Sequence, residues 1–99
     1  MLWDAVLSRT SELFLEGLSP EEIEDCKRTI LDELCDNPEP LNNPSRSVVR
    51  SFPNRPGVIE HAIGGWHFRY VILNSNTIGI ASIYYSPMNP KHPLYQEPT

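Results

Sequence analysis

The chain has 99 residues, a hydrophobic content of 39% and a net charge of −5 at pH 7. This length allows one domain with a single modest core. No apolar run approaches the roughly 20 residues that a membrane helix needs, and the N-terminus lacks the pattern of a secretory signal. We therefore expect one domain over residues 1–99, located in the cytoplasm and without a membrane partner.

The two cysteines, Cys26 and Cys35, are nine residues apart on one predicted helix, too far along its axis to form a disulfide. The sequence contains no CxxC motif and no cluster of cysteine and histidine. We therefore expect two buried, reduced thiols, no metal site and no cofactor.

Charge is divided unevenly along the chain. Residues 1–40 contain three basic and eleven acidic residues, whereas residues 41–99 contain five basic residues, two acidic residues and all three histidines. Such asymmetry points to contact between the basic half and nucleic acid or another polyanion. Acidic residues that merely solvate exposed helix faces produce the same pattern, so both interpretations stay open.

A helical hairpin is predicted for residues 1–36. The apolar residues of its first helix, residues 3–18, follow helical spacing: Trp3, Val6, Leu7, Phe14 and Leu18. The second helix begins at Ser19-Pro20-Glu21-Glu22, where Ser19 and Glu22 form a capping box around a proline in the first turn. It ends before Asn37-Pro38 because the residue preceding a proline avoids the α conformation.

Four antiparallel strands are predicted after a Pro-rich loop at residues 37–46. The β-meander occupies residues 47–86, with strands at 47–52, 58–63, 66–73 and 77–85, and residues 87–99 form an irregular tail. Gly64-Gly65 suits a two-residue hairpin turn, which pairs Ile63 with Trp66 and Glu60 with Arg69. The fold class is therefore α+β in the order ααββββ, with the helical hairpin packed on a four-stranded antiparallel sheet.

The register also assigns the faces of this sheet. The face that covers the helices carries Ile59, His61, Ile63, Trp66, Phe68, Tyr70 and Ile72. We expect His61 to be a hydrogen-bonded core residue there. The opposite face carries Glu60, His67 and Arg69, and we expect it to be open to water.

Three short segments occur in a recognisable order: Asn37-Pro38-Glu39-Pro40-Leu41, then Arg55-Pro56-Gly57-Val58-Ile59-Glu60, then Ile63-Gly64-Gly65-Trp66-His67-Phe68-Arg69-Tyr70. They resemble the P-E-P-L segment, the R-x-P-G segment and the R-x-x-Y hairpin of the RelE/ParE superfamily of toxins from bacterial toxin–antitoxin pairs. The likeness covers about residues 20–86. It implies a helical hairpin laid on a small antiparallel sheet.

The chain also departs from the superfamily pattern. Members usually begin with a β-strand, whereas a helix is predicted here. His67 stands where an arginine is expected three residues before Tyr70, and the usual catalytic pair would fall near Ser86-Pro87. The resemblance therefore implies a toxin whose endonuclease catalytic set is incomplete.

RNA cleavage by such a toxin activates a ribose 2′-hydroxyl, stabilises the crowded phosphate and protonates the leaving 5′-oxygen. The resemblance suggests Glu39 as base, His67 as acid and Arg69 as phosphate clamp, with Tyr84 or Tyr85 stacking on a base. The candidate catalytic residues are Glu39, His67, Arg69 and Tyr85. The candidates for binding RNA or another target are Arg46, Arg50, Arg55 and Tyr84. Ordinary structural roles are the more frequent explanation for such residues: a solvated loop for Glu39, a surface position for His67, and a cross-strand pair with Glu60 for Arg69.

The expected function is that of a RelE/ParE-like toxin that acts on RNA and translation as an mRNA interferase, or on a protein target such as a topoisomerase. Its expected partners are an antitoxin and either the ribosome with its RNA or a topoisomerase. The alternative is a non-catalytic interaction or regulatory module on the same scaffold, because a fold alone does not fix a function.

Overall fold

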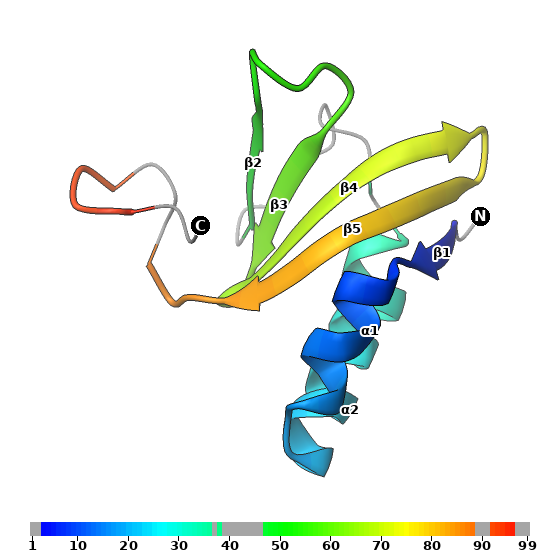
Figure 1. The fold of residues 1–99 in the computed structure, drawn as a ribbon, viewed down its shortest axis with the longest axis vertical. Helices are drawn as coiled ribbons and strands as arrows, with labels where there is room; N and C mark the ends of the chain where they lie inside the picture. The colour runs from blue at the N-terminus through cyan, green and yellow to red at the C-terminus, as the bar shows by residue number, and fades with distance from the viewer. Residues whose placement is uncertain (1–2, 37, 39–46, 89–91, 97–99) are drawn as a thin grey trace.

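The computed structural model describes residues 3–36, 38, 47–88 and 92–96, and residues 47–50 are described by their backbone alone. It has two layers, a twisted sheet and a pair of helices that packs on one face of it (Figure 1). The elements in chain order are β1 (Asp4–Leu7), α1 (Arg9–Glu16), α2 (Pro20–Thr29), the π-helical η1 (Ile30–Leu34), β2 (Ser47–Ser51), β3 (Ile59–Ile63), β4 (Trp66–Asn74) and β5 (Thr77–Tyr85).

The sheet has five strands in the order β1-β5-β4-β3-β2. Strands β2 to β5 form the predicted antiparallel meander, which confirms the α+β class and the helix-on-sheet arrangement. The prediction of a purely antiparallel four-stranded sheet was wrong, because β1 joins the edge of the sheet parallel to β5.

Strand β1 replaces the predicted first turn of the N-terminal helix. Residues Asp4 to Leu7 alternate between exposed and half-buried, which is the period of a strand. The amides of Asp4 and Ser8 donate to the carbonyls of Asn76 and Ile80, at 2.8 and 3.0 Å. Ser8 then caps α1 by accepting from the amide of Ser11, so the helix begins only at Arg9.

The sequence signals for the start of α2 and for the β3–β4 turn predicted the structure correctly. The predicted capping box is present: the Ser19 hydroxyl accepts from the Glu22 amide, and the Glu22 carboxylate accepts from the Ser19 amide. Gly64 and Gly65 have φ values of 58° and 93°, which a primed hairpin turn requires. The predicted pairs of β3 and β4, from Ile63–Trp66 to Ile59–Tyr70, are all confirmed.

The core lies between the helices and the sheet. Its buried residues come from both layers: Leu15, Cys26, Ile30, Leu34 and Cys35 from the helical layer, and Ile59, Ile63, Trp66, Phe68, Tyr70, Ile78, Ile80 and Ile83 from the sheet. The Tyr70 hydroxyl donates to the carbonyl of Pro38, which joins two of the three segments that resemble the superfamily. His61 is buried as predicted, but neither of its ring nitrogens has a hydrogen-bond partner among the described residues, which contradicts the expectation of a bonded histidine.

Candidate functional site

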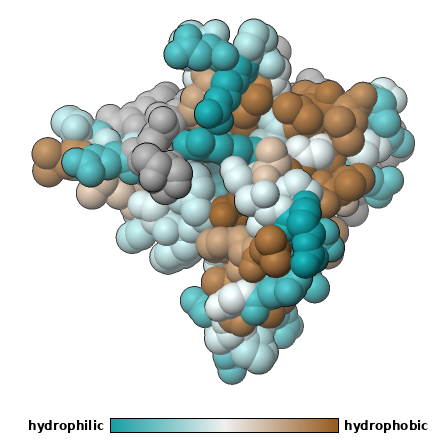
Figure 2. Space-filling view, in the orientation of Figure 1, coloured by the Kyte–Doolittle hydropathy of each residue, from teal (hydrophilic) through white to brown (hydrophobic). Residues whose placement is uncertain are grey.

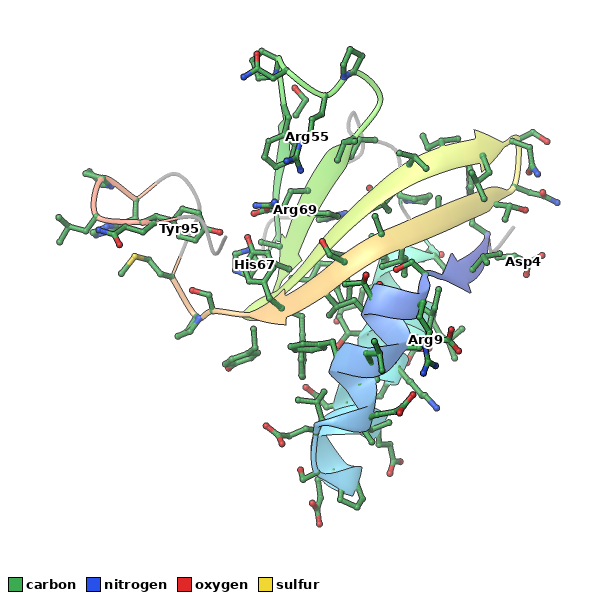
Figure 3. The ribbon with its side chains drawn as sticks, viewed as in Figure 1. Asp4, Arg9, Arg55, His67, Arg69 and Tyr95 are labelled. Carbon is green, nitrogen blue, oxygen red and sulfur yellow. The ribbon has the colours of Figure 1, made fainter. Side chains whose placement is uncertain are left out.

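A cluster of polar and aromatic side chains lies on the sheet face opposite the helices (Figure 3). Its members are Glu60 on β3, His67 and Arg69 on β4, Tyr84 on β5, and Tyr95 in the C-terminal segment, residues 92–96. Strand geometry explains the grouping, because Glu60 pairs with Arg69 and His67 pairs with Tyr84 in the sheet register. Alternation along β4 turns Phe68 and Tyr70 to the core and the two polar residues to this face.

Glu60 is the centre of the cluster. One carboxylate oxygen, Oε1, accepts from Arg69 Nε at 2.9 Å, and the other, Oε2, lies 3.2 Å from His67 Nδ1. The Glu60 side chain is completely buried. A buried carboxylate is tolerated when it is paired and hydrogen-bonded. The contacts on both oxygens therefore stabilise Glu60 in this position and hold the Arg69 guanidinium and the His67 imidazole in place.

His67 is buried between Glu60, the end of β5 and two tyrosine rings. Its Nε2 lies 2.8 Å from the carbonyl oxygen of Ser86, at the end of β5. Its ring stacks on Tyr84 at a centroid distance of 4.5 Å and on Tyr95 at 5.9 Å. Only 1% of the residue is exposed.

Arg69 is held more openly than His67, with 15% of its side chain exposed. Its guanidinium carbon lies 4.9 Å from the centre of the Phe52 ring and 5.6 Å from that of Tyr84, both within cation–π range. Burial acts to lower the pKa of Arg69, but the hydrogen bond and the charge of Glu60 outweigh it and raise the pKa. Arg69 is therefore a permanent cation at the rim of the cluster.

The C-terminal segment packs on the His67 and Tyr84 side of the cluster. The hydroxyls of Tyr84 and Tyr95 are hydrogen-bonded to each other, and burial, followed by contacts with Tyr95 and Glu60, raises the pKa of Tyr84. The prediction that this face is open to water was therefore wrong for Glu60 and His67. For His67 the physical reason is that residues 92–96 form a turn, closed by a bond from the Tyr95 amide to the His92 carbonyl, and the Tyr95 ring stacks on the imidazole. Glu60 is buried in contact with His67 and Arg69.

The other predicted site residues are placed as follows. Glu39 and Arg46 lie outside the described residues. Arg50 is opposite Glu60 in the β2–β3 register, but its side chain is outside the described part. Arg55 is exposed in the loop between β2 and β3 (Figure 3). Tyr85 does not join the cluster, because it is 56% exposed and packs edge-on against Trp66, a core residue of the opposite face.

Two members of the cluster, Glu60 and Tyr95, were not predicted as site residues. For Glu60 the signal was present, since the hairpin register already paired it with Arg69 and placed His67 on the same face. For Tyr95 no sequence signal was available, because its position depends on the return of the C-terminal segment.

Away from this polar cluster, part of the surface is hydrophobic. Figure 2 shows hydrophobic side chains gathered at the end of the β4–β5 hairpin and near β1, and the exposed large residues there include Val6, Ile72 and Leu73. A hollow of about 400 Å³ beside β1 is lined mainly by apolar side chains, including Trp3, Leu7, Ile30 and Leu31.

Within the described ranges, no three cysteine, histidine or acidic residues are grouped to hold a metal ion. The helices described here are not long and apolar enough to span a bilayer.

The fold is similar to that of chains in solved RelE–RelB toxin–antitoxin complexes. The toxin–antitoxin complex RelBE2 from Mycobacterium tuberculosis matches with a TM-score of 0.67 and 16% identity, over 89% of this chain and 95% of that chain. The intact RelBE complex of E. coli matches with a TM-score of 0.59 and 11% identity, over 85% and 96%. The archaeal RelE–RelB complex from Pyrococcus horikoshii OT3 matches with a TM-score of 0.59 and 12% identity, over 88% and 97%. No protein-family model and no curated protein sequence matches the chain.

Proposed function

We propose that this chain is the toxin component of a RelE-like toxin–antitoxin pair and that it acts on RNA. One observation supports the proposal most strongly. A proton-transfer group, His67, and a fixed cation, Arg69, both contact Glu60 on the sheet face opposite the helices of a RelE-like fold. Neither group alone suggests RNA chemistry. Together they supply the acid and the phosphate clamp that cleavage of a ribose–phosphate chain needs.

The proposed reaction is transfer of the phosphate within the RNA strand. A base takes the proton of a ribose 2′-hydroxyl, and the 2′-oxygen forms a new bond to phosphorus. The bond from phosphorus to the 5′-oxygen breaks, leaving a 2′,3′-cyclic phosphate, and His67 gives a proton to the 5′-oxygen. Arg69 stabilises the extra negative charge on the phosphate oxygens. Glu39 is the candidate base that the sequence resemblance supplies.

RNA binding would extend from this cluster along the β2–β3 side of the sheet. Arg55 is exposed in the β2–β3 loop, and Arg46 and Arg50 precede it in sequence. Arginines on this side would contact successive phosphates and make binding dependent on salt. Tyr84 would stack on a base once the covering segment moves.

The proposed partner is an antitoxin. The matching solved structures from M. tuberculosis, E. coli and P. horikoshii are complexes of a RelE with a RelB. This chain offers an edge strand, β1, next to the apolar hollow that Trp3, Leu7 and Leu31 line. An extended partner segment pairs with such an edge through its backbone and places apolar side chains in the neighbouring hollow.

The test is controlled expression of the chain in bacteria with measurement of growth and of RNA cleavage. Wild type should arrest growth and cut RNA, whereas the double variant His67→Gln, Arg69→Gln should do neither. Glutamine keeps an N–H donor for Glu60, so the buried carboxylate is not left unpaired, and circular dichroism would verify the fold. The control is Arg9→Gln, because Arg9 makes an exposed ion pair with Glu16, away from the cluster. Cleavage that persists in the double variant would reject the site.

A second candidate is favoured by one observation, the burial of His67 and Glu60. A non-catalytic interaction module, or a toxin that blocks a protein such as a topoisomerase, needs no accessible proton donor. In either case the polar cluster would stabilise the sheet and would have no catalytic role. Growth arrest without RNA cleavage would support a protein target, and an absence of any effect would support the module.

A further inference from the structure

The two ring nitrogens of His67 both face hydrogen-bond acceptors. Nδ1 lies 3.2 Å from a carboxylate oxygen of Glu60, and Nε2 lies 2.8 Å from the carbonyl oxygen of Ser86. A carbonyl oxygen accepts and never donates, and an ionised carboxylate behaves in the same way. A neutral imidazole carries one N–H. Its other ring nitrogen would then present a lone pair to the lone pair of either the Glu60 or the Ser86 oxygen, which is not a hydrogen bond. Both contacts are satisfied only if the Glu60–His67 pair holds one additional proton.

The surroundings place this proton on the imidazole. Glu60 also accepts from Arg69 Nε at 2.9 Å, and the permanent charge of the guanidinium favours the ionised carboxylate. Among the side chains that the structure describes, the other titratable groups that face the His67 ring are the phenols of Tyr84 on β5 and Tyr95 in the C-terminal segment. Burial raises the pKa of the Tyr84 phenol, so that ring adds no charge beside the imidazole. On the β2 side, Arg50 is in register with Glu60, and its side chain lies outside the described part.

We propose that Glu60 is the positioning residue of the site, which holds His67 as the doubly protonated imidazolium and orients it through Nδ1. When the proton on Nε2 leaves, the neutral ring keeps its Nδ1–H on Glu60, so Nε2 is the nitrogen that donates. In the structure the Ser86 carbonyl oxygen is the acceptor beside Nε2. During the reaction the leaving 5′-oxygen would take the place of this carbonyl. The catalytic part of this inference rests on the proposed function, whereas the protonation of His67 does not.

The protonation is measured directly by NMR of protein labelled with ¹⁵N-histidine. At pH 7 both ring nitrogens of His67 should have the chemical shifts of protonated nitrogen. The exposed His92 provides a second histidine for comparison in the same spectrum. A single protonated nitrogen on His67 in the wild type at pH 7 would overturn the proposal, and this measurement requires no variant.

The variant Glu60→Gln tests the role of the carboxylate. A glutamine amide can donate to Nδ1, so His67 would become the neutral Nε2–H tautomer, still bonded to Ser86. We expect loss of the Nδ1 proton at pH 7 in Glu60→Gln and no change in the control Glu12→Gln, an exposed residue of α1. A doubly protonated His67 in Glu60→Gln would show that Glu60 does not hold the proton.

The pH dependence of RNA cleavage tests the catalytic part. Loss of a general acid reduces the rate about a hundredfold or more. We expect a loss of that size for Glu60→Gln at pH 8 and partial recovery at pH 6, where the ring regains its proton. A uniform loss at every pH would indicate a structural role and overturn the positioning role. Protonated His67 without any RNA cleavage by wild type would instead reject the proposed function.

Discussion

The hydroxyl of Tyr84 on β5 is hydrogen-bonded to the hydroxyl of Tyr95 in the C-terminal segment, and both rings stack beside the imidazole of His67. This contact joins residues from the sheet and from a segment that belongs to no helix or strand. It leaves His67 buried on a sheet face that strand alternation alone would expose. The accessibility of the candidate site therefore depends on one aromatic side chain of the segment.

Tyr95→Ala should expose His67. The substitution removes the hydroxyl contact and one of the two stacked rings, while the sheet hydrogen bonds of β4 and β5 are unaffected. We expect a several-fold increase in the relaxation of His67 ring protons by a soluble paramagnetic gadolinium chelate. The control is Leu94→Ala, because Leu94 is 74% exposed. Equal relaxation in both variants would show that Tyr95 does not cover the ring.

Buried His61 should make the protein sensitive to acid. Burial lowers its pKa from an ordinary value of 6.5 to about 4. Between pH 6.5 and 4 the unfolded chain binds a proton that the folded chain does not, so stability falls as the pH falls through this window. The change is of the order of 1 kcal/mol per pH unit at most.

His61→Phe should reduce this acid sensitivity and leave the protein at least as stable at pH 7. The variant removes two buried nitrogens that have no hydrogen-bond partner in the described part of the chain, each costing about 1–3 kcal/mol. The measurement is the free energy of unfolding in urea at pH 7, 6 and 5. His92→Phe is the control, since His92 is exposed. An identical pH slope in wild type and His61→Phe would contradict the assignment.

Asp25 connects α2 to the β3–β4 hairpin. Its Oδ2 accepts from Trp66 Nε1 at 2.8 Å, and its Oδ1 accepts from Arg28 at 2.7 Å. Asp25→Ala should cost about 1–2 kcal/mol, because the indole N–H of buried Trp66 loses its acceptor. Asp25→Asn retains an acceptor and should cost less. In a Trp66→Phe background the cost of Asp25→Ala should shrink, and equal costs in both backgrounds would exclude the coupling.

Two glycines provide a matched comparison of backbone strain and steric clash. Gly57 and Gly65 both have positive φ, at 85° and 93°. A Cβ at Gly57 would meet nothing within 4 Å, whereas one at Gly65 would lie 2.8 Å from the Tyr85 ring. Gly57→Ala should cost about 1–2 kcal/mol of stability from strain alone. Gly65→Ala should cost more, and Tyr85→Ala should relieve only that excess in thermal unfolding experiments.

Much of the meander was predictable because it depends on neighbouring residues. Gly64 and Gly65 set the turn, the turn sets the pairing, and the pairing places Glu60, His67 and Arg69 on one face. The resemblance to RelE/ParE toxins is confirmed at the level of the fold. The roles of Glu39, Arg46 and the other candidate site residues stay predictions.

Local chemistry in the sequence by itself determined the helix caps, the hairpin turn and the register of β3 with β4. The residues involved are at most 11 positions apart, from Ile63–Trp66 to Ile59–Tyr70 in the β3–β4 register, so a short window of sequence contains both partners. Tertiary structure alone decided that residues Asp4 to Leu7 form a strand, because their backbone partners on β5 lie about 70 residues away. It also decided that Tyr95 returns to bury His67. A short segment with few local bonds takes the conformation of whatever distant surface satisfies its backbone and covers its apolar side chains.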